Sequence, residues 1–210
     1  MLDYGIYYEF LPFENINDEN PTTYSLEEVK VDKNYAIIIS TNGGLWRYMI
    51  GDTIKFTSLS PYRIKITGRT KHFINAFGEE VIVDNSDKAI STACRETGAV
   101  FKDYTACPIY FKGSDVGGHE WIVEFEQQPD NFEKFVDVLD QTLRDVNSDY
   151  DAKRFKDLAL KRPKVHNAPT DTFYNWLKSK GKLGGQHKVP RLANERKYVE
   201  EILPIIKQTY

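Results

Sequence analysis

Three short segments of the chain place charged side chains beside glycines, where a backbone can turn and present a side chain to a ligand. In the first segment, Asp52 follows Gly51 at the end of a stretch with β character. Such an aspartate can direct its carboxylate out of a sheet, and its two oxygens can accept hydrogen bonds from the two hydroxyls of a ribose. The alternative interpretation is a simple Gly-Asp turn.

The second segment is centred on Arg69, which follows Gly68 at the end of another expected strand. A guanidinium at that position can donate hydrogen bonds to the same ribose or to a phosphate. A surface arginine in a hairpin is the structural alternative. The pattern therefore indicates a nucleotide site only in combination with Asp52.

The third segment, residues 181–191, is rich in glycine and contains Lys182 and Lys188. A lysine in a pliable loop can bring a cation to the negative charge that develops on a reacting phosphate. Pro190 limits the freedom of the loop at its end. A basic surface loop without a catalytic role is the alternative.

Other chemistries find little support in the residue pattern. The four histidines (His72, His119, His166 and His187) are dispersed and have no zinc-ligand spacing, so no metal site is predicted. The sequence contains no serine elbow or Cys/His pair that would indicate hydrolysis. Cys94 and Cys107 lie among apolar residues, which predicts buried free thiols in a reducing compartment and hence the cytoplasm.

The hydrophobic pattern predicts an α+β protein. Short β segments are expected at 4–11, 35–40, 45–50, 53–57 and 63–67, a spacing typical of a small barrel or curled sheet. Helices are expected at 86–97, 130–146, 170–180 and 194–203, with strands at 100–111 and 120–126. Asp130 and Glu133 predict a capping box, and Pro204 is expected to end the last helix. This second part should place helices on one face of an antiparallel sheet.

Charge is distributed unevenly along the chain, although the net charge is only −3. Residues 1–150 contain 14 Lys and Arg against 25 Asp and Glu, whereas residues 151–210 contain 14 against 6. A basic end of this kind can bind nucleic acid or another polyanion. It can equally pack on the acidic part of the same molecule, and the sequence leaves both interpretations open.

The order of the three segments resembles that of acyl-adenylate-forming enzymes. More narrowly, residues 7–12 (YYEFLP), 44–52 (GLWRYMIGD) and 186–191 (QHKVPR) are similar to the YFEFLP, GLYRYRVGD and QYKVPR segments of the plant auxin-responsive acyl-acid amido synthetase family. Thr172 and Phe173 also resemble its TF-x-x-L stretch. The resemblance spans nearly the whole chain and is strongest at its ends.

The resemblance implies an enzyme that uses ATP and Mg²⁺ to convert a small carboxylic acid into an acyl-adenylate and then transfers the acyl group to an amino acid. Asp52 would bind the ribose hydroxyls, with Tyr48 close to the nucleotide and Arg69 beside the ribose or phosphate. Lys188 would contact the α-phosphate and the acyl carboxylate, and Lys182 is the second candidate for that cation.

The resemblance also implies two lobes: a β subdomain at residues 1–69 that ends a large lobe, and a mobile C-terminal lid at residues 70–210. The hinge is expected at Thr70 and Lys71, which stand where the broader superfamily often has an acidic residue. Met49 replaces the usual arginine of the plant pattern. Nothing in residues 1–40 resembles the family's phosphate loop, so we expect a fragment that needs its N-terminal lobe and is inactive alone.

Two further hypotheses remain open at this stage. The basic segment 151–210 could make the chain a nucleic-acid-binding module, or the chain could be a stand-alone interaction domain derived from such an enzyme. We do not expect a membrane-spanning segment, because no apolar run approaches the roughly 20 residues that a bilayer requires.

Overall fold

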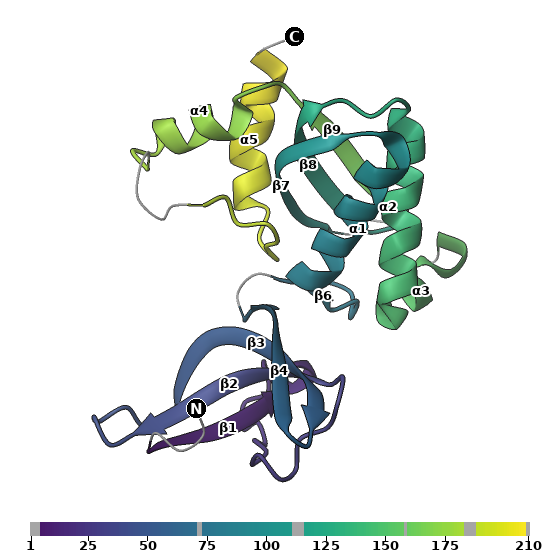
Figure 1. The fold of residues 1–210 in the computed structure, drawn as a ribbon. Coiled ribbons are helices and arrows are strands. Elements are labelled where there is room, and N and C mark those ends of the chain that lie inside the picture. Colours follow the sequence, from purple (N-terminus) through teal and green to yellow (C-terminus); the bar gives the residue numbers. More distant parts are fainter. Residues whose placement is uncertain (1–4, 71–72, 111–115, 158, 183–187, 209–210) are drawn as a thin grey trace. The chain divides into compact units, whose positions relative to one another are not determined.

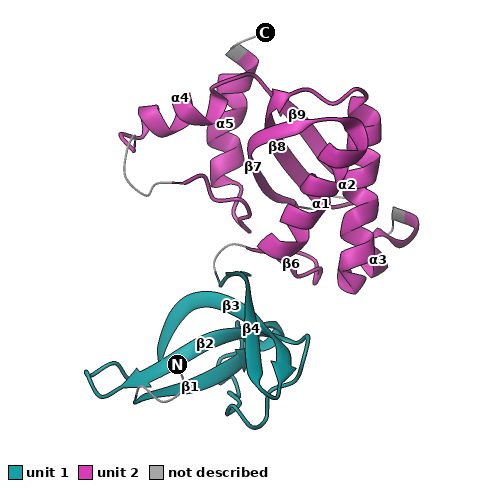
Figure 2. Cartoon of the chain, in the orientation of Figure 1, with its two compact units in different colours: residues 1–71 teal, residues 72–210 magenta. Residues whose placement is uncertain are grey.

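The computed structural model describes residues 5–70, 73–110, 116–157, 159–182 and 188–208 (Figure 1). The chain divides into two compact units, residues 1–71 and residues 72–210, which Figure 2 shows in different colours. Each unit has its own hydrophobic core.

The first unit is built on a four-stranded antiparallel sheet in the order β1-β2-β3-β4. Its elements are β1 (Ile6–Pro12), the short 3-10 helix η1 (Phe13–Asn15), β2 (Asn34–Thr41), β3 (Tyr48–Leu59) and β4 (Tyr62–Arg69). Phe10, Tyr35 and Phe56 pack edge to face on one side of the sheet, with ring centroids 5.0–6.2 Å apart. These contacts join β1, β2 and β3 through buried aromatic surface.

The sheet is curled but open, since β1 and β4 form its two edges in the described residues. The sequence predicts either a small barrel or a curled sheet, and the β subdomain is the curled sheet. The segments 45–50 and 53–57 do not form two strands: residues 48–50 and 53–57 both belong to β3, which is interrupted by a bulge and not by a turn.

The second unit is a mixed α+β domain. Its elements are β5 (Phe73–Ile74), β6 (Val81–Ile82), α1 (Val83–Thr97), β7 (Val100–Ile109), β8 (Gly118–Gln127), α2 (Phe132–Val146), α3 (Ser148–Arg154), η2 (Phe155–Asp157), β9 (Lys164–Ala168), α4 (Thr172–Ser179) and α5 (Lys197–Gln208). The main sheet has the order β7-β8-β9, and β5 pairs with β6 separately.

Helices cover both faces of the main sheet (Figure 1), where the sequence predicted only one covered face. Trp121 and Val123 of β8 pack with α1 and α2, whereas Ile122 between them packs with α4 and α5. Residues 121–123 are all apolar, as a strand covered on both faces requires. The sheet is also not purely antiparallel, because β9 pairs in parallel with β8.

Two helix ends differ from the prediction. Asn131, not Asp130, caps α2, since its side chain accepts a hydrogen bond from the N–H of Lys134 (3.0 Å) and the N–H of Asp130 is bound to the carbonyl of Thr97. Helix α5 continues through Pro204 instead of ending before it. Buried Ile202 and Ile206 lie on either side of the proline in one cluster, so packing offsets the lost backbone hydrogen bond.

Both cysteines are buried free thiols, as predicted. Burial raises the pKa of the Cys107 thiol to about 12 and also raises that of Cys94. Within the described ranges, no helix is long and apolar enough to cross a membrane.

A buried ion pair connects α2 with α3 and the chain that follows. The Arg154 guanidinium donates to both carboxylate oxygens of Asp140 (2.6–3.2 Å) and to the carbonyl of Leu160 (2.9 Å). The hydroxyl of Tyr150 donates to the same carboxylate at 2.8 Å. Asp140 and Arg154 are both buried, so the loss of either partner leaves an uncompensated charge.

We therefore expect Arg154→Met to lower the free energy of unfolding of this unit by about 3–5 kcal/mol. Arg144→Met is the matched control: Arg144 pairs with Asp151 in a much more exposed position, and its loss should change stability by less than about 0.5 kcal/mol. The measurement is urea denaturation followed by far-UV circular dichroism, because the described α-helices all belong to this unit. Equal losses in the two variants would contradict the prediction.

Candidate functional site

Asp52 and Arg69 lie side by side on neighbouring strands of the first unit. They are paired residues of β3 and β4, and Arg69 Nε donates to Asp52 Oδ1 at 3.1 Å. The Asp52 side chain is 35% exposed and that of Arg69 is 59% exposed. A carboxylate and a guanidinium predicted to share one ligand are thus brought together at the surface.

A bulge around Gly51 positions Asp52. Between the pairs Ala36–Thr53 and Ile38–Met49, β3 advances four residues while β2 advances two. Gly51 takes a φ of +94°, which favours glycine, and its carbonyl accepts a hydrogen bond from the N–H of Thr70 at 2.9 Å. A bulge of this kind re-aims the side chains beside it. Asp52 therefore leaves the ladder with β2 and pairs only with β4.

Tyr48, the other predicted nucleotide contact, begins β3 and is more than half exposed. The residue before it has a role that the sequence reasoning missed. Arg47 donates to the largely buried carboxylate of Glu9 (Nε to Oε2, 3.2 Å), and Thr23 donates to the same carboxylate at 2.7 Å. This ion pair connects the YYEFLP segment of β1 with the GLWRYMIGD segment that leads into β3.

The two candidate lysines lie in the second unit and differ in how they are held. Lys182 follows the end of α4, where its N–H donates to the carbonyl of Leu177 (3.0 Å), and its side chain is exposed. Lys188 is also exposed but directly precedes Val189, which is buried against α4 and α5. Residues 183–187, part of the predicted glycine-rich loop, lie outside the described residues.

The chain after Lys188 is attached to the edge of the main sheet. Thr105 of β7 donates its hydroxyl hydrogen to the carbonyl of Pro190 (2.7 Å). The N–H of Ala106 donates to the carbonyl of Arg191 (2.8 Å), and the N–H of Ala193 returns a hydrogen bond to Ala106 (3.1 Å). Lys188 thus stands at the beginning of a segment with a fixed backbone.

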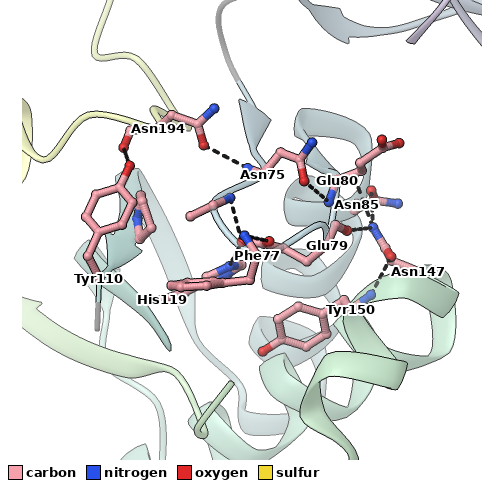
Figure 3. A network of polar contacts seen from close by, with 12 residues as sticks. Asn75, Phe77, Glu79, Glu80, Asn85, Tyr110, His119, Asn147, Tyr150 and Asn194 are labelled. Carbon is pink, nitrogen blue, oxygen red and sulfur yellow. Dashed lines mark hydrogen bonds and ion pairs between the residues drawn. The ribbon is translucent and has the colours of Figure 1, made fainter. Parts of the chain in front are cut away.

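A second polar cluster, shown in Figure 3, involves the loop between β5 and β6. Fully buried Glu79 accepts hydrogen bonds from the N–H groups of Phe77 (2.7 Å) and Ala76 (3.3 Å) and lies 3.0 Å from Nε2 of buried His119. The N–H of Asn75 donates to the side chain of Asn194 at 2.7 Å. The buried Glu79 carboxylate therefore holds the β5–β6 loop, and Asn75 connects this loop to the chain beyond Lys188.

Burial by itself raises the pKa of Glu79, but the hydrogen bond and charge of His119 and the backbone N–H groups outweigh it and leave the pKa below its ordinary value of 4.5. Such a carboxylate stabilises the fold at pH values above its ordinary pKa. The partnership with His119 was not predicted, because the two residues are 40 positions apart and neither stands in a recognisable pattern.

The basic C-terminal segment packs largely on acidic groups of its own unit. Arg162 pairs with Glu133 and Asp137, and Arg196 pairs with Glu120. Further ion pairs of the segment join Lys164 and His166 to Glu120, Arg154 to Asp140, Arg191 to Asp87, and Lys180 to Glu201. These pairs form within the second unit, so they favour the interpretation in which the basic segment packs on acidic groups of the same molecule.

The predicted site residues are distributed over both units. Tyr48, Asp52 and Arg69 belong to the first unit, with Thr70 at its end, whereas Lys182 and Lys188 belong to the second. Lys71, the other predicted hinge residue, lies outside the described residues. The convergence of Asp52 and Lys188 on one nucleotide stays a prediction.

Comparison with known proteins identifies the family. The model of the GH3 family central domain matches residues 1–69, and that of the GH3 family C-terminal domain matches residues 84–197. The second match covers more than half of the chain, which therefore belongs to the GH3 family.

The chain is similar to curated enzymes of Arabidopsis thaliana. It is 26% identical over 201 residues to indole-3-acetic acid-amido synthetase GH3.3, covering 90% of this chain and 33% of that protein. It is 24% identical over 216 residues to 4-substituted benzoates-glutamate ligase GH3.12, covering 92% of this chain and 36% of that protein. The chain thus spans about a third of the length of these relatives.

A solved structure shares the fold. The GH3.15 acyl acid amido synthetase superposes with a TM-score of 0.69 at 21% sequence identity, over 97% of this chain and 35% of that one. This match confirms the α+β fold class predicted from the sequence. The family-model matches confirm the predicted resemblance to the amido synthetase family.

The Glu79 cluster generates a pH-dependent prediction. Glu79→Gln should lower the free energy of unfolding by about 1–3 kcal/mol near neutral pH, because a buried charged acceptor is lost. Since the folded-state pKa of Glu79 is depressed, this contribution is complete above 4.5 and is lost as the pH falls below it. The stability difference between wild type and variant should therefore shrink from about pH 7 to about pH 3.5.

The measurement is the urea midpoint of both proteins across this pH range. Glu126→Gln, a substitution on the exposed end of β8, is the control and should shift the midpoint little at any pH. A Glu79→Gln penalty that stays constant down to the lowest pH would contradict the assigned cause.

Proposed function

We propose that the chain is part of an ATP-dependent acyl-acid amido synthetase. The carboxylate oxygen of a small organic acid attacks the α-phosphorus of ATP, the bond to the leaving pyrophosphate breaks, and an acyl-adenylate forms. The amino nitrogen of an amino acid then attacks the acyl carbon, the bond to AMP breaks, and the amine proton passes to solvent. The observation that supports this most is the exposed Asp52–Arg69 pair at a glycine bulge, in a unit that matches the family's central domain.

In this proposal, the first unit binds the nucleoside. Asp52 is already half-engaged by Arg69 through Oδ1, and its remaining capacity suits a pair of ribose hydroxyls, because a carboxylate has about four acceptor positions. Arg69 can donate its other N–H groups to ribose or phosphate oxygens. Tyr48 offers an exposed ring and hydroxyl at the start of the same strand.

The second unit supplies the cation, and we place Lys188 before Lys182 in this role. A catalytic group works best when its own backbone is held, since charge stabilisation in the transition state depends on groups that are already in position. Lys188 continues into a segment hydrogen-bonded to β7, whereas the contact that holds Lys182 among the described residues is its N–H bond to the end of α4. The Lys188 ammonium would stabilise the charge that accumulates on the α-phosphate and the acyl carboxylate.

Magnesium enters the proposal with ATP. Among the described residues, no group of three or more His, Cys, Asp or Glu side chains is arranged to bind a metal ion. The ion would therefore be coordinated mainly by ATP phosphates and water, a mode that Mg²⁺ commonly adopts.

The division of labour follows the two units. We assign residues 1–69 to the end of the large lobe and residues 70–210 to a lid that turns at Thr70 and Lys71. Because the relatives are about three times as long, we infer that the activity needs an N-terminal lobe of the same chain and that this third is inactive alone. The buried free cysteines support our proposal that the complete enzyme works in the cytoplasm.

The roles of the lysines can be separated in the complete protein by acid-dependent exchange of pyrophosphate into ATP. Lys188→Ala should reduce the exchange rate by about 10²–10³-fold, because a cation directed at the transition state is lost. Lys182→Ala, on the other side of the same loop, should leave most of the rate. The opposite ranking would transfer the catalytic role to Lys182, and normal exchange in both variants would remove it from this loop.

Asp52→Asn tests the nucleoside site. The substitution keeps the shape of the side chain but removes its charge, so we expect the KM for ATP to rise by about 10–100-fold, the equivalent of roughly 1.5–3 kcal/mol in hydrogen bonds to a charged group. Asp18→Asn, in an exposed loop of the same unit, is the control. An unchanged KM would exclude Asp52 from the ATP site.

A further inference from the structure

Arg191, three residues beyond Lys188, is held by a cluster that the proposed reaction does not itself require. Its Nη1 donates to both carboxylate oxygens of Asp87 on α1. Its guanidinium also lies over the ring of Tyr104 on β7, with 5.5 Å between the central carbon and the ring centroid. The Arg191 side chain thus connects the lysine segment with both α1 and β7.

The partners of Arg191 are themselves fixed. The buried Tyr104 hydroxyl donates to Asp87 Oδ1 at 2.6 Å and lies 2.8 Å from the hydroxyl of Ser86. The ring of Tyr104 stacks on that of Trp121, with centroids 5.5 Å apart. Tyr104 therefore orients the Asp87 carboxylate independently of Arg191. A planar guanidinium is the group best suited to donate to a carboxylate while it stacks on an aromatic ring.

The same segment places Lys188 close to this cluster. Asp103 lies next to Tyr104 on β7, where burial raises the pKa of its carboxyl and the charges of Arg191 and Lys188 act in the opposite direction. Asp103 is thus a carboxyl at the edge of β7 on which the charges of both Arg191 and Lys188 act. Only Val189 and Pro190 separate Lys188 from Arg191 along the chain.

We propose that Arg191 is a positioning residue for Lys188: Asp87 and Tyr104 hold its guanidinium, and this contact sets the backbone from which Lys188 extends. The proposal rests on the function proposed above. A hydrogen bond from the Thr105 hydroxyl and backbone hydrogen bonds with Ala106 hold the segment on one side, and the Arg191 side chain adds a second attachment through α1. Without that second attachment, the segment would be held less tightly at the strand and would lose a defined orientation.

The test uses the complete protein and compares Arg191→Gln with Arg162→Gln. Arg162 is a matched control, because it also pairs with two carboxylates in this unit. It is distant from Lys188 in the sequence, and its partners Glu133 and Asp137 belong to α2. Arg191→Gln should lower kcat for pyrophosphate exchange by about 10–100-fold with little change in the KM for ATP, since a misplaced cation weakens the transition state more than ground-state binding. Arg162→Gln should leave both constants unchanged.

A double-mutant cycle separates positioning from a general structural effect. If Arg191 acts through Lys188, Arg191→Gln should cause no further loss in a Lys188→Ala background, whereas independent effects would multiply. Asp87→Asn should reproduce the Arg191→Gln phenotype, and the two together should not be additive. Multiplicative effects, or Arg191→Gln kinetics equal to those of wild type, would overturn the proposal.

Amide hydrogen exchange provides a readout that does not depend on activity. Arg191→Gln should increase exchange in the peptide that covers 189–193 while α1 and β8 remain protected, and unchanged exchange there would contradict the proposal. The outcomes also distinguish the two levels of inference. Full pyrophosphate-exchange activity in Lys188→Ala would overturn the proposed role of Lys188. An inactive Lys188→Ala variant together with a fully active Arg191→Gln variant would overturn only the role of Arg191.

Discussion

The short parallel pairing of Leu192 with Ala106 at the edge of β7 is the contact on which the second unit's candidate site depends. An edge strand presents unpaired N–H and C=O groups, and the chain after Lys188 occupies some of them. This pairing determines where Lys188 begins, where Arg191 meets α1, and where Asn194 reaches Asn75 in the β5–β6 loop. A motif near the C-terminal end of the sequence is thereby built into the centre of the domain.

The electrostatics of the second unit follow the same logic. The buried carboxylate of Glu120 pairs with His166 and Lys164 of β9 and with Arg196, which precedes α5. Their hydrogen bonds and charges hold the pKa of Glu120 well below its ordinary value despite burial. The basic C-terminal segment and the acidic residues of α1, β8 and α2 are therefore complementary parts of the second unit. Of the two interpretations of the charge asymmetry that the sequence left open, packing within the molecule is the one that the ion pairs support.

The sequence predicted elements well where the apolar pattern was strong and poorly where backbone contacts decide. Helices α1, α2 and α4 were expected close to their observed positions, because their apolar residues repeat at helical spacing. Strand β9 was missed: Lys164–Ala168 is short and polar, and it is a strand because its backbone pairs with β8. Helix α5 was cut short at Pro204, since local propensity could not anticipate the isoleucines that pack on both sides of it.

The site shows the same limit. Asp52 and Arg69 were predicted to share a ligand from their place at strand ends, and strand pairing does bring them within hydrogen-bond distance. The bulge that separates Asp52 from β2 leaves only Gly51 as a signal in the sequence. The Arg47–Glu9 pair and the Glu79–His119 pair have no local signature, because each joins residues that are distant in sequence and adjacent only in the folded protein.

The attachments on either side of residues 71–72 define how a turn at the proposed hinge could occur. On the first unit, the last described contact of the strand is Thr70, whose N–H donates to the carbonyl of Gly51 beside Asp52. On the second unit, Phe73 already pairs with Ile82, and Asn75 is bound to Asn194 beyond the lysine segment. Thr70 is thus held by the strand that carries Asp52, and Asn75 is held by the chain that carries Lys188. In the proposed function, a turn at Thr70 and Lys71 would therefore move each group of candidate residues together with its own unit.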